Sequence, residues 1–193
     1  MQKLTPSDLF TLEAYARERP AFRARVLAHK QARSVHLGAH LTLLFEDRLT
    51  VQYQVQEMLR IERIFEEAGI RDEHDAYNPL IPDGANLKAT LLIEYPDPAV
   101  RTRKLVELRD IEHRMTLRIG DLAPVIAIAD EDMQRSNAEK TSAVHFLRFE
   151  LSRAHVAAFK HRGEVEFVVE HAAYQGKTTL ATATRTALAA DLD

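Results

Sequence analysis

The chain has 193 residues, of which 46% are hydrophobic and 28% charged, with a formal net charge of −3. This composition is typical of one globular domain, and the slight acidity argues against a nucleic-acid-binding protein, which would usually be basic. The complete lack of cysteine excludes disulfides, thiolate metal sites and cysteine-ligated iron–sulfur clusters.

No apolar run approaches the roughly 18 residues that a membrane span needs, so we expect no membrane association. The opening sequence MQKLTPSDLF has no hydrophobic segment of the kind that begins a signal peptide. Together with the missing cysteines, this predicts a cytoplasmic location.

N-terminal helices are predicted over residues 6–33, beginning at the capping sequence Thr5-Pro6-Ser7-Asp8. Pro20 is expected to end or kink the first of them, because proline disrupts a helix interior, and residues 20–33 then form a second, basic helix. Alternating apolar residues over 34–45 predict two short strands that flank a turn at Gly38.

A long amphipathic central helix is predicted over residues 47–68, with Gly69 as its stop signal. Glu62 falls inside its apolar stripe, and Glu57 lies on one flank of that stripe. The neighbours of Glu62 on this stripe are Val51, Val55, Met58 and Phe65. A buried carboxylate needs an arginine, a histidine, a metal ion or a proton as its partner. A structural ion pair and a functional carboxylate therefore both stay open.

Residues 71–84 are predicted to be a polar loop punctuated by prolines. Its YNPLIPDG segment suits either a binding rim formed by Tyr77, Asn78 and Asp83 or a rigid connector. Mixed strands and helices follow over 87–173, and a helix of small residues over 178–192 ends the chain. Residues 1–193 are thus expected to form a single α+β domain, with a largely antiparallel sheet packed against the central helix and an N-terminal helical pair.

Two histidines lie on apolar faces of predicted strands, His145 in residues 142–151 and His171 in residues 164–173. If both faces meet the central helix, these imidazoles join Glu57 and Glu62 in a site suited to iron, manganese or zinc. A lone histidine on such a face is more often an ordinary core residue, and this interpretation also stays open. The residues expected to support the ligands or line the pocket are Tyr53, Gln54, Arg148 and Glu150.

The sequence Gly176-Lys177-Thr178-Thr179 superficially matches the end of a phosphate-binding loop. The first glycine of that motif would have to stand at position 171, where the chain has His171. We therefore expect no bound nucleotide.

Four segments carry a resemblance to a known family: LTPSDLFTLEAYARERPAFRARVLAHK, LLFEDRLTVQYQVQEMLRIERIFEEAGI, YNPLIPDG and EKTSAVHFLRFEL. Over nearly the whole chain they resemble a bacterial family of uncharacterised single-domain proteins, a domain of unknown function. Its members are often encoded beside rubrerythrin-like and iron–sulfur oxidoreductase proteins. The resemblance implies a role near peroxide or iron metabolism, and it supplies no catalytic residues.

Two functions of different classes follow. The first is a His/carboxylate metal-binding protein, with non-haem iron as one candidate, that is accessory to a peroxide-response or electron-transfer system. The second is a non-catalytic interaction module that docks on a rubrerythrin-like or iron–sulfur redox partner through its acidic or its basic surface, the latter including Arg23, Arg25 and Lys30. Small-molecule binding under the YNPLIPDG loop is a third function that stays open, without a sequence motif to support it. The residues assign neither an enzymatic activity nor an oligomeric state.

Overall fold

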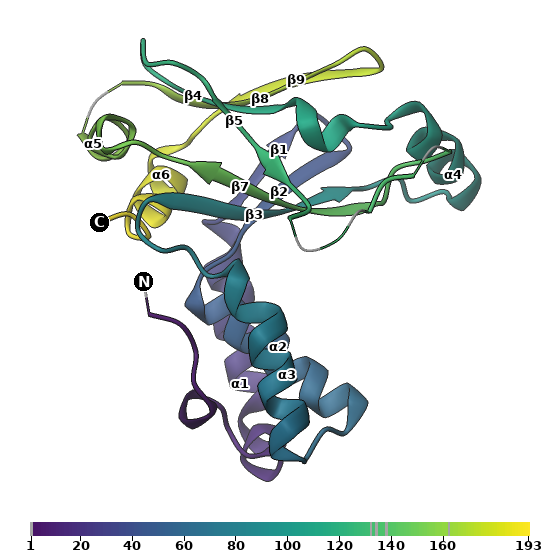
Figure 1. Cartoon of the computed structure of the whole chain (residues 1–193), viewed down its shortest axis with the longest axis vertical. Coiled ribbons are helices and arrows are strands. Elements are labelled where there is room, and N and C mark those ends of the chain that lie inside the picture. Colours follow the sequence, from purple (N-terminus) through teal and green to yellow (C-terminus); the bar gives the residue numbers. More distant parts are fainter. Residues whose placement is uncertain (1, 132, 134, 138, 162) are drawn as a thin grey trace.

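A computed structural model describes residues 2–131, 133, 135–137, 139–161 and 163–193. Two antiparallel sheets lie one above the other, and helices α1, α2 and α3 extend away from the lower sheet (Figure 1). The strand order is β1-β2-β3-β7-β6 in one sheet and β5-β4-β8-β9 in the other. The predicted α+β class, with antiparallel sheets packed against helices, is confirmed.

The helices are η1 (Pro6–Asp8), α1 (Leu12–Gln31), α2 (Arg48–Glu62), α3 (Glu67–Tyr77), η2 (Asn78–Leu80), α4 (Pro98–Glu107), η3 (Ile111–Arg114), α5 (Arg153–His161) and α6 (Thr182–Ala189). The strands are β1 (Ser34–Leu37), β2 (Leu41–Phe45), β3 (Asn86–Ile93), β4 (Met115–Ile119), β5 (Val125–Ile126), β6 (Ile128–Ala129), β7 (Val144–Glu150), β8 (Val165–His171) and β9 (Tyr174–Thr179).

Helix α1 continues through Pro20 without a break, so the predicted boundary at this proline is wrong. Only the single 3-10 turn η1 precedes it. Proline removes one hydrogen bond from a helix, but tertiary packing supplies most helical stability in proteins. Tyr15 precedes the proline and Phe22 and Val26 follow it, and all three are buried in one small core. This shared packing keeps the two halves in one helix.

The predicted central helix is two helices in the structure. Helix α2 ends at Glu62, the following residue Arg63 has a left-handed φ of 55°, and α3 begins at Glu67. Gly69 therefore lies inside α3 and is not a stop signal. The reversal leaves Phe65 67% exposed, and Glu62 is exposed as well. The prediction that Glu62 lies in a buried stripe is wrong, because the apolar pattern was extended past the real end of the helix.

The main hydrophobic core lies between the two sheets. Phe167 of β8 packs against Phe45 of β2 and Phe149 of β7, with ring centroids 5.0 and 5.2 Å away. The chain passes from one sheet to the other at Ala127, between β5 and β6, where the Ala127 amide donates to the Met115 carbonyl at 2.9 Å. The two sheets are therefore continuous along this side.

Strands β1 and β9 approach each other on the opposite side of the core. The Tyr174 hydroxyl donates to the Leu37 carbonyl at 2.6 Å, and the Thr178 hydroxyl donates to the His36 carbonyl. A side chain at Gly176 would place its Cβ 3.3 Å from the backbone of Leu37, so glycine permits this close approach. The two sheets form a nearly closed barrel.

Strand β9 was not predicted, and the last helix begins at Thr182 instead of Thr178. Helices α1, α2 and α3 are held by two smaller hydrophobic clusters of their own, one around Val51 and Val55 and one around Phe22. No helix among the described parts of the chain combines the length and apolar character needed to cross a lipid bilayer.

Candidate metal centre

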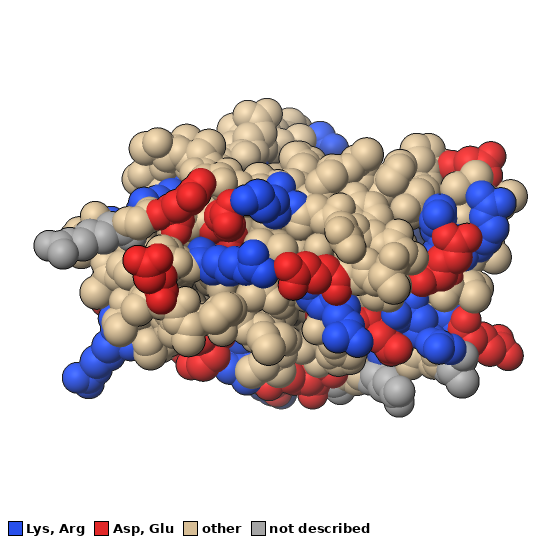
Figure 2. Space-filling model, turned by 90° about the horizontal axis from the view of Figure 1, so that it is seen from above, with Lys and Arg blue, Asp and Glu red and all other residues tan. Residues whose placement is uncertain are grey.

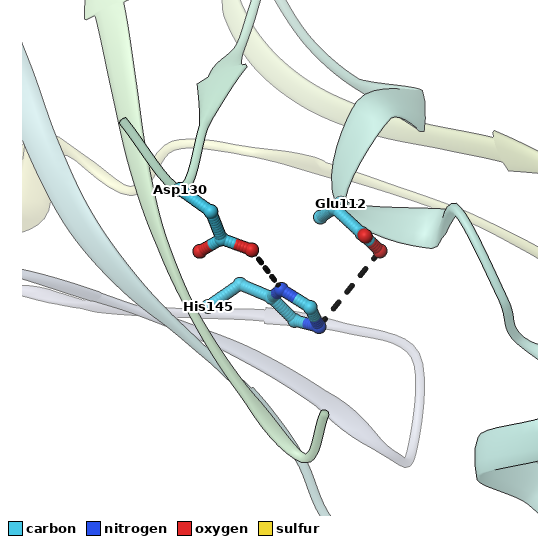
Figure 3. Close-up of side chains that lie close together, drawn as sticks. All are labelled: Glu112, Asp130 and His145. Atoms are coloured by element: carbon cyan, nitrogen blue, oxygen red, sulfur yellow. Dashed lines mark hydrogen bonds and ion pairs between the residues drawn. The ribbon is translucent and has the colours of Figure 1, made fainter. Parts of the chain in front are cut away.

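Three ionisable side chains meet inside the barrel: Glu112 of η3, Asp130 immediately after β6, and His145 of β7 (Figure 3). Their side chains are 2%, 9% and 0% exposed, respectively. One potential ligand atom from each lies within 4.8 Å of those of the other two. The pairing of β6 with β7 brings Asp130 to His145, and η3 leads into β4 of the facing sheet.

The His145 ring has a carboxylate beside each nitrogen. Nδ1 lies 2.6 Å from Asp130 Oδ2, and Nε2 lies 3.8 Å from Glu112 Oε2. Nε2 is also 2.8 Å from the Thr141 hydroxyl and 3.1 Å from the Ser142 carbonyl oxygen. With the ring N–H on Nδ1 donating to Asp130, the lone pair of Nε2 lies on the side of Glu112 and Thr141.

The two carboxylates are held by different partners. Glu112 accepts hydrogen bonds from the hydroxyls of Ser136 and Thr141, the latter at 3.1 Å. Asp130 accepts from the Phe146 amide at 3.0 Å, and its own amide donates to the Phe146 carbonyl at 2.8 Å. Asp130 has a left-handed φ of 50°, which places its carboxylate over β7. Arg135 lies 3.5 Å from the same carboxylate.

The donor set fits an ion that prefers nitrogen and oxygen ligands. Two ligands bound to one zinc or iron ion at about 2.0–2.2 Å lie at most about 4.4 Å apart. The 3.8 Å between His145 Nε2 and Glu112 Oε2 satisfies this limit. A carboxylate hydrogen-bonded to the other ring nitrogen is also the usual way to orient a metal-binding histidine. His145 and Glu112 would therefore face the ion, and Asp130 would orient the ring.

Of the four predicted ligands, only His145 lies in this cluster. Glu57 accepts from Tyr15 at 2.6 Å and from Arg19 at 2.7 Å, so the ion-pair interpretation holds for Glu57. The hydrogen bond from Arg19, followed by that from Tyr15, lowers the pKa of Glu57 to about 2 despite its partial burial. Glu62 is exposed at the end of α2. His171 lies 3.0 Å from the carbonyl oxygen of Arg109.

The predicted supporting residues are dispersed as well. Tyr53 packs against Phe22 at 6.0 Å between ring centroids, and the Gln54 amide donates to Glu46 at 3.2 Å. Arg148 and Glu150 pair with each other on the outer face of β7, away from His145.

The three rim residues have separate surroundings. Asn78 accepts from the Leu4 amide at 2.8 Å and so holds the N-terminal segment. Asp83 accepts from the Ala85 amide at 2.9 Å. Tyr77 lines a cavity at the junction of α3 with the sheet.

Glu112 and Asp130 were missed by the sequence reasoning. Glu112 lies among alternating charges that predict only a surface helix over 99–113, and the helix α4 ends at Glu107 before it. Asp130 opens the acidic and polar segment 130–140, in which no strand pattern marks a buried side chain. Within it, residues 132, 134 and 138 lie outside the described part of the chain. The one available signal was the position of Asp130 directly after an apolar strand.

The upper face of the molecule shows acidic and basic side chains interleaved, without a broad area of one sign (Figure 2). Arg118 pairs with Glu170 and Lys177 with Glu166, each at 2.9 Å, on the outer face of the second sheet. Exposed pairs of this kind contribute little to stability.

The fold and the cluster define a class: an α+β domain built on a nearly closed antiparallel barrel, with a buried site of two carboxylates and one histidine. The chain belongs to the family described as protein of unknown function (DUF3501), which matches residues 3–192. It is 52% identical to a novel protein of unknown function from Burkholderia pseudomallei K96243, whose crystal structure superposes with a TM-score of 0.94 over 100% of both chains. The comparison with curated proteins finds no match.

Proposed function

We propose that the protein binds one divalent metal ion, iron, manganese or zinc, through His145 and Glu112, with Asp130 orienting the imidazole. The observation that supports this proposal most strongly is the meeting of three buried ionisable side chains from three different elements. Nitrogen and oxygen donors suit these ions, whereas a copper(I) site would favour sulfur ligands.

The charge balance of the cluster supports an ion beside Glu112. Asp130 has a cationic neighbour, because Arg135 lies 3.5 Å away. Within the described residues, the one ion-pair partner of Glu112 is His145, at 3.8 Å. Buried carboxylates are stable only when their charge is compensated. A divalent ion between Glu112 and His145 would supply that compensation.

The proposal includes an accessory role in a peroxide-response or electron-transfer system, and its support is the family resemblance described above. Docking of a redox partner on the basic side of α1 stays a prediction. Arg23 and Arg25 are exposed there.

Metal analysis of protein purified without a tag or chelator tests the site directly. We expect about one equivalent of iron, manganese or zinc per chain, and its loss in Glu112→Gln and His145→Ala. The matched controls are Glu57→Gln and His171→Ala, which change the same residue types outside the cluster and should keep the metal. Less than about a tenth of an equivalent, before and after reconstitution, would rule out a metal centre.

Thermal unfolding gives a second readout. A ligand at a hundred times its Kd stabilises the folded state by about 2.7 kcal/mol, which corresponds to a rise of roughly 5–11 °C in Tm for a chain of this size. We expect this rise for the parent protein and the two controls when the metal is added. The Glu112→Gln and His145→Ala proteins should show none, whatever their starting Tm.

A further inference from the structure

The structure contains a cavity of 830 Å³ on the side of β3 and β7 that faces away from the barrel core. It lies where α2 and α3 meet the first sheet (Figure 1). Lys88, Phe146 and Arg148 form part of its floor, and Glu73, Tyr77 and Leu80 line the opposite wall. Side chains alternate between the faces of a strand, so Phe146 lies in this cavity while its neighbour His145 points into the metal centre. Small-molecule sites typically have volumes of about 300–1,000 Å³.

The floor of the cavity brings two cations together. Lys88 and Arg148 are direct partners in the register of β3 with β7, an arrangement that is unfavourable for like charges. Arg148 is neutralised by Glu131, with two hydrogen bonds of 2.8 Å. Lys88 has a single hydrogen-bond partner in the described part of the protein, the carbonyl oxygen of Pro79. Burial, together with the charge of Arg148, lowers the pKa of Lys88. Among the described residues no carboxylate forms an ion pair with Lys88, although the charges of Asp83, Glu131 and Glu150 partly offset the lowering of its pKa.

The opposite wall carries a glutamate with one carboxylate oxygen that accepts no hydrogen bond from the described part of the chain. Glu73 Oε2 is buried and has no hydrogen-bond partner among the described residues. Burial, followed by the charges of Glu62 and Asp72, raises the pKa of Glu73. Buried polar atoms in native proteins are nearly always hydrogen-bonded, so an unpaired carboxylate oxygen on a residue that lines a cavity leaves this side chain able to accept a hydrogen bond from a bound ligand.

Apolar groups line the same cavity. They are Met58 of α2, Leu80 of η2 and Phe146 of β7. The cavity thus offers a cation on its floor, an acid on its wall and apolar surface beside them. The complementary ligand has an anionic group, a hydrogen-bond-donating cation and an apolar body.

We propose that this cavity binds a small zwitterion of the amino-acid or dipeptide class. Its carboxylate contacts Lys88, its ammonium group contacts Glu73, and its apolar side chain packs against Met58, Leu80 and Phe146. The cavity is on the opposite face of β7 from the metal centre, so this proposal does not depend on bound metal.

Titration of the full-length protein with L-leucine, L-phenylalanine and leucyl-leucine, monitored by NMR and calorimetry in the presence of chelator, tests the site. We expect saturable binding of at least one probe at millimolar concentration. The amide of that probe lacks the carboxylate, and the deaminated acid lacks the ammonium group. Each should bind more weakly by about tenfold or more, the effect of losing one charge-assisted contact.

Two variants separate the two ends of the ligand. Lys88→Met should weaken the binding of the zwitterion and of the deaminated acid, and it should leave the affinity for the amide unchanged. Glu73→Gln should weaken the binding of the zwitterion and of the amide, and it should leave the affinity for the deaminated acid unchanged. The control Lys177→Met removes an exposed lysine on β9 and should bind every probe normally. Absence of saturable binding for all three probes, or parental affinity in Lys88→Met with an unchanged melting temperature, would overturn the proposal.

Discussion

Glu57 shows how a carboxylate on α2 is accommodated by side chains alone. Its side chain is 15% exposed and pairs with Arg19, while Tyr15 donates to the same carboxylate from a buried position on α1. Arg60 adds a further contact at 3.2 Å. This cluster joins α1 to α2, and it needs no ion, because a cation and a hydroxyl already satisfy the acid.

The lowered pKa of Glu57 makes this cluster sensitive to acid. The folded-state pKa of about 2 lies below the ordinary value of 4.5, so the ionised form stabilises the fold above pH 4.5. That stabilisation is lost as the pH falls towards 2. We expect Glu57→Gln to have a lower Tm than the parent at pH 7 and to converge with it near pH 2. Thermal unfolding across this range measures the effect, and Glu67→Gln, at an exposed pair, should follow the parent curve at every pH.

Glu62 is expected to tolerate an apolar replacement. It is exposed at the last residue of α2, so Glu62→Met removes no buried partner. Surface substitutions of this kind usually change the free energy of unfolding by less than about 0.5 kcal/mol. Leu59→Ala, one turn earlier on the buried side of the same helix, should cost about 2–5 kcal/mol in chemical denaturation. A large loss in Glu62→Met would place this side chain in a buried contact.

Among the elements, the end of α1 is joined to β2 and to the C-terminal segment by a single side chain. Arg33 is 1% exposed and donates to the carbonyl oxygens of Phe45 and Ala187, at 3.1 and 3.2 Å. Its guanidinium also pairs with Asp191, and it lies 3.5 Å from Asp47, the N-cap of α2. Burial raises the pKa of Asp191 even beside this arginine. Asp191 therefore depends on Arg33 to remain buried.

Removal of the Arg33 charge should be strongly destabilising. Arg33→Met leaves a buried carboxylate without its partner, which typically costs about 3–5 kcal/mol, or roughly 6–20 °C in Tm. Arg33→Met combined with Asp191→Leu should recover much of that loss, because an apolar pair replaces a buried ion pair well. Chemical denaturation of the two single variants and the double variant measures the coupling. Equal stability of Arg33→Met and the parent would show that the pair contributes nothing.

Elements with a clear local pattern could be predicted from the sequence. The strand that contains His145 was expected over residues 142–151 and is found at Val144–Glu150. The course of α1 past Pro20 depends on packing against other elements, which a local rule for proline does not include. Strand β9, YQGKTT, alternates between half-buried and exposed positions and contains little apolar sequence. Its pairing with β8 makes it a strand, and side-chain contacts with β1 depend on the fold.

The site was predictable only in part for the same reason. His145 was identifiable because a histidine on an apolar strand face needs a partner. The identity of that partner depends on contacts between distant segments. The pairing of β6 with β7 places Asp130 beside His145, and η3, which leads into β4 of the other sheet, places Glu112 there. No spacing in the sequence encodes these contacts. Glu57 and Glu62 lie on a helix that packs in a separate hydrophobic cluster.

For the molecule as a whole, the near closure of the barrel has a consequence for association between chains. An exposed strand edge presents unpaired amides and carbonyls that a strand from another molecule can extend, a process called β-augmentation, which also templates fibrils. Here β5 and β6 are two residues each and continue from one sheet into the other, while the Tyr174 and Thr178 hydroxyls of β9 bridge to carbonyl oxygens of β1. These short or side-chain-bridged edges limit what a strand from another molecule could extend, so we expect edge-to-edge polymerisation to be disfavoured.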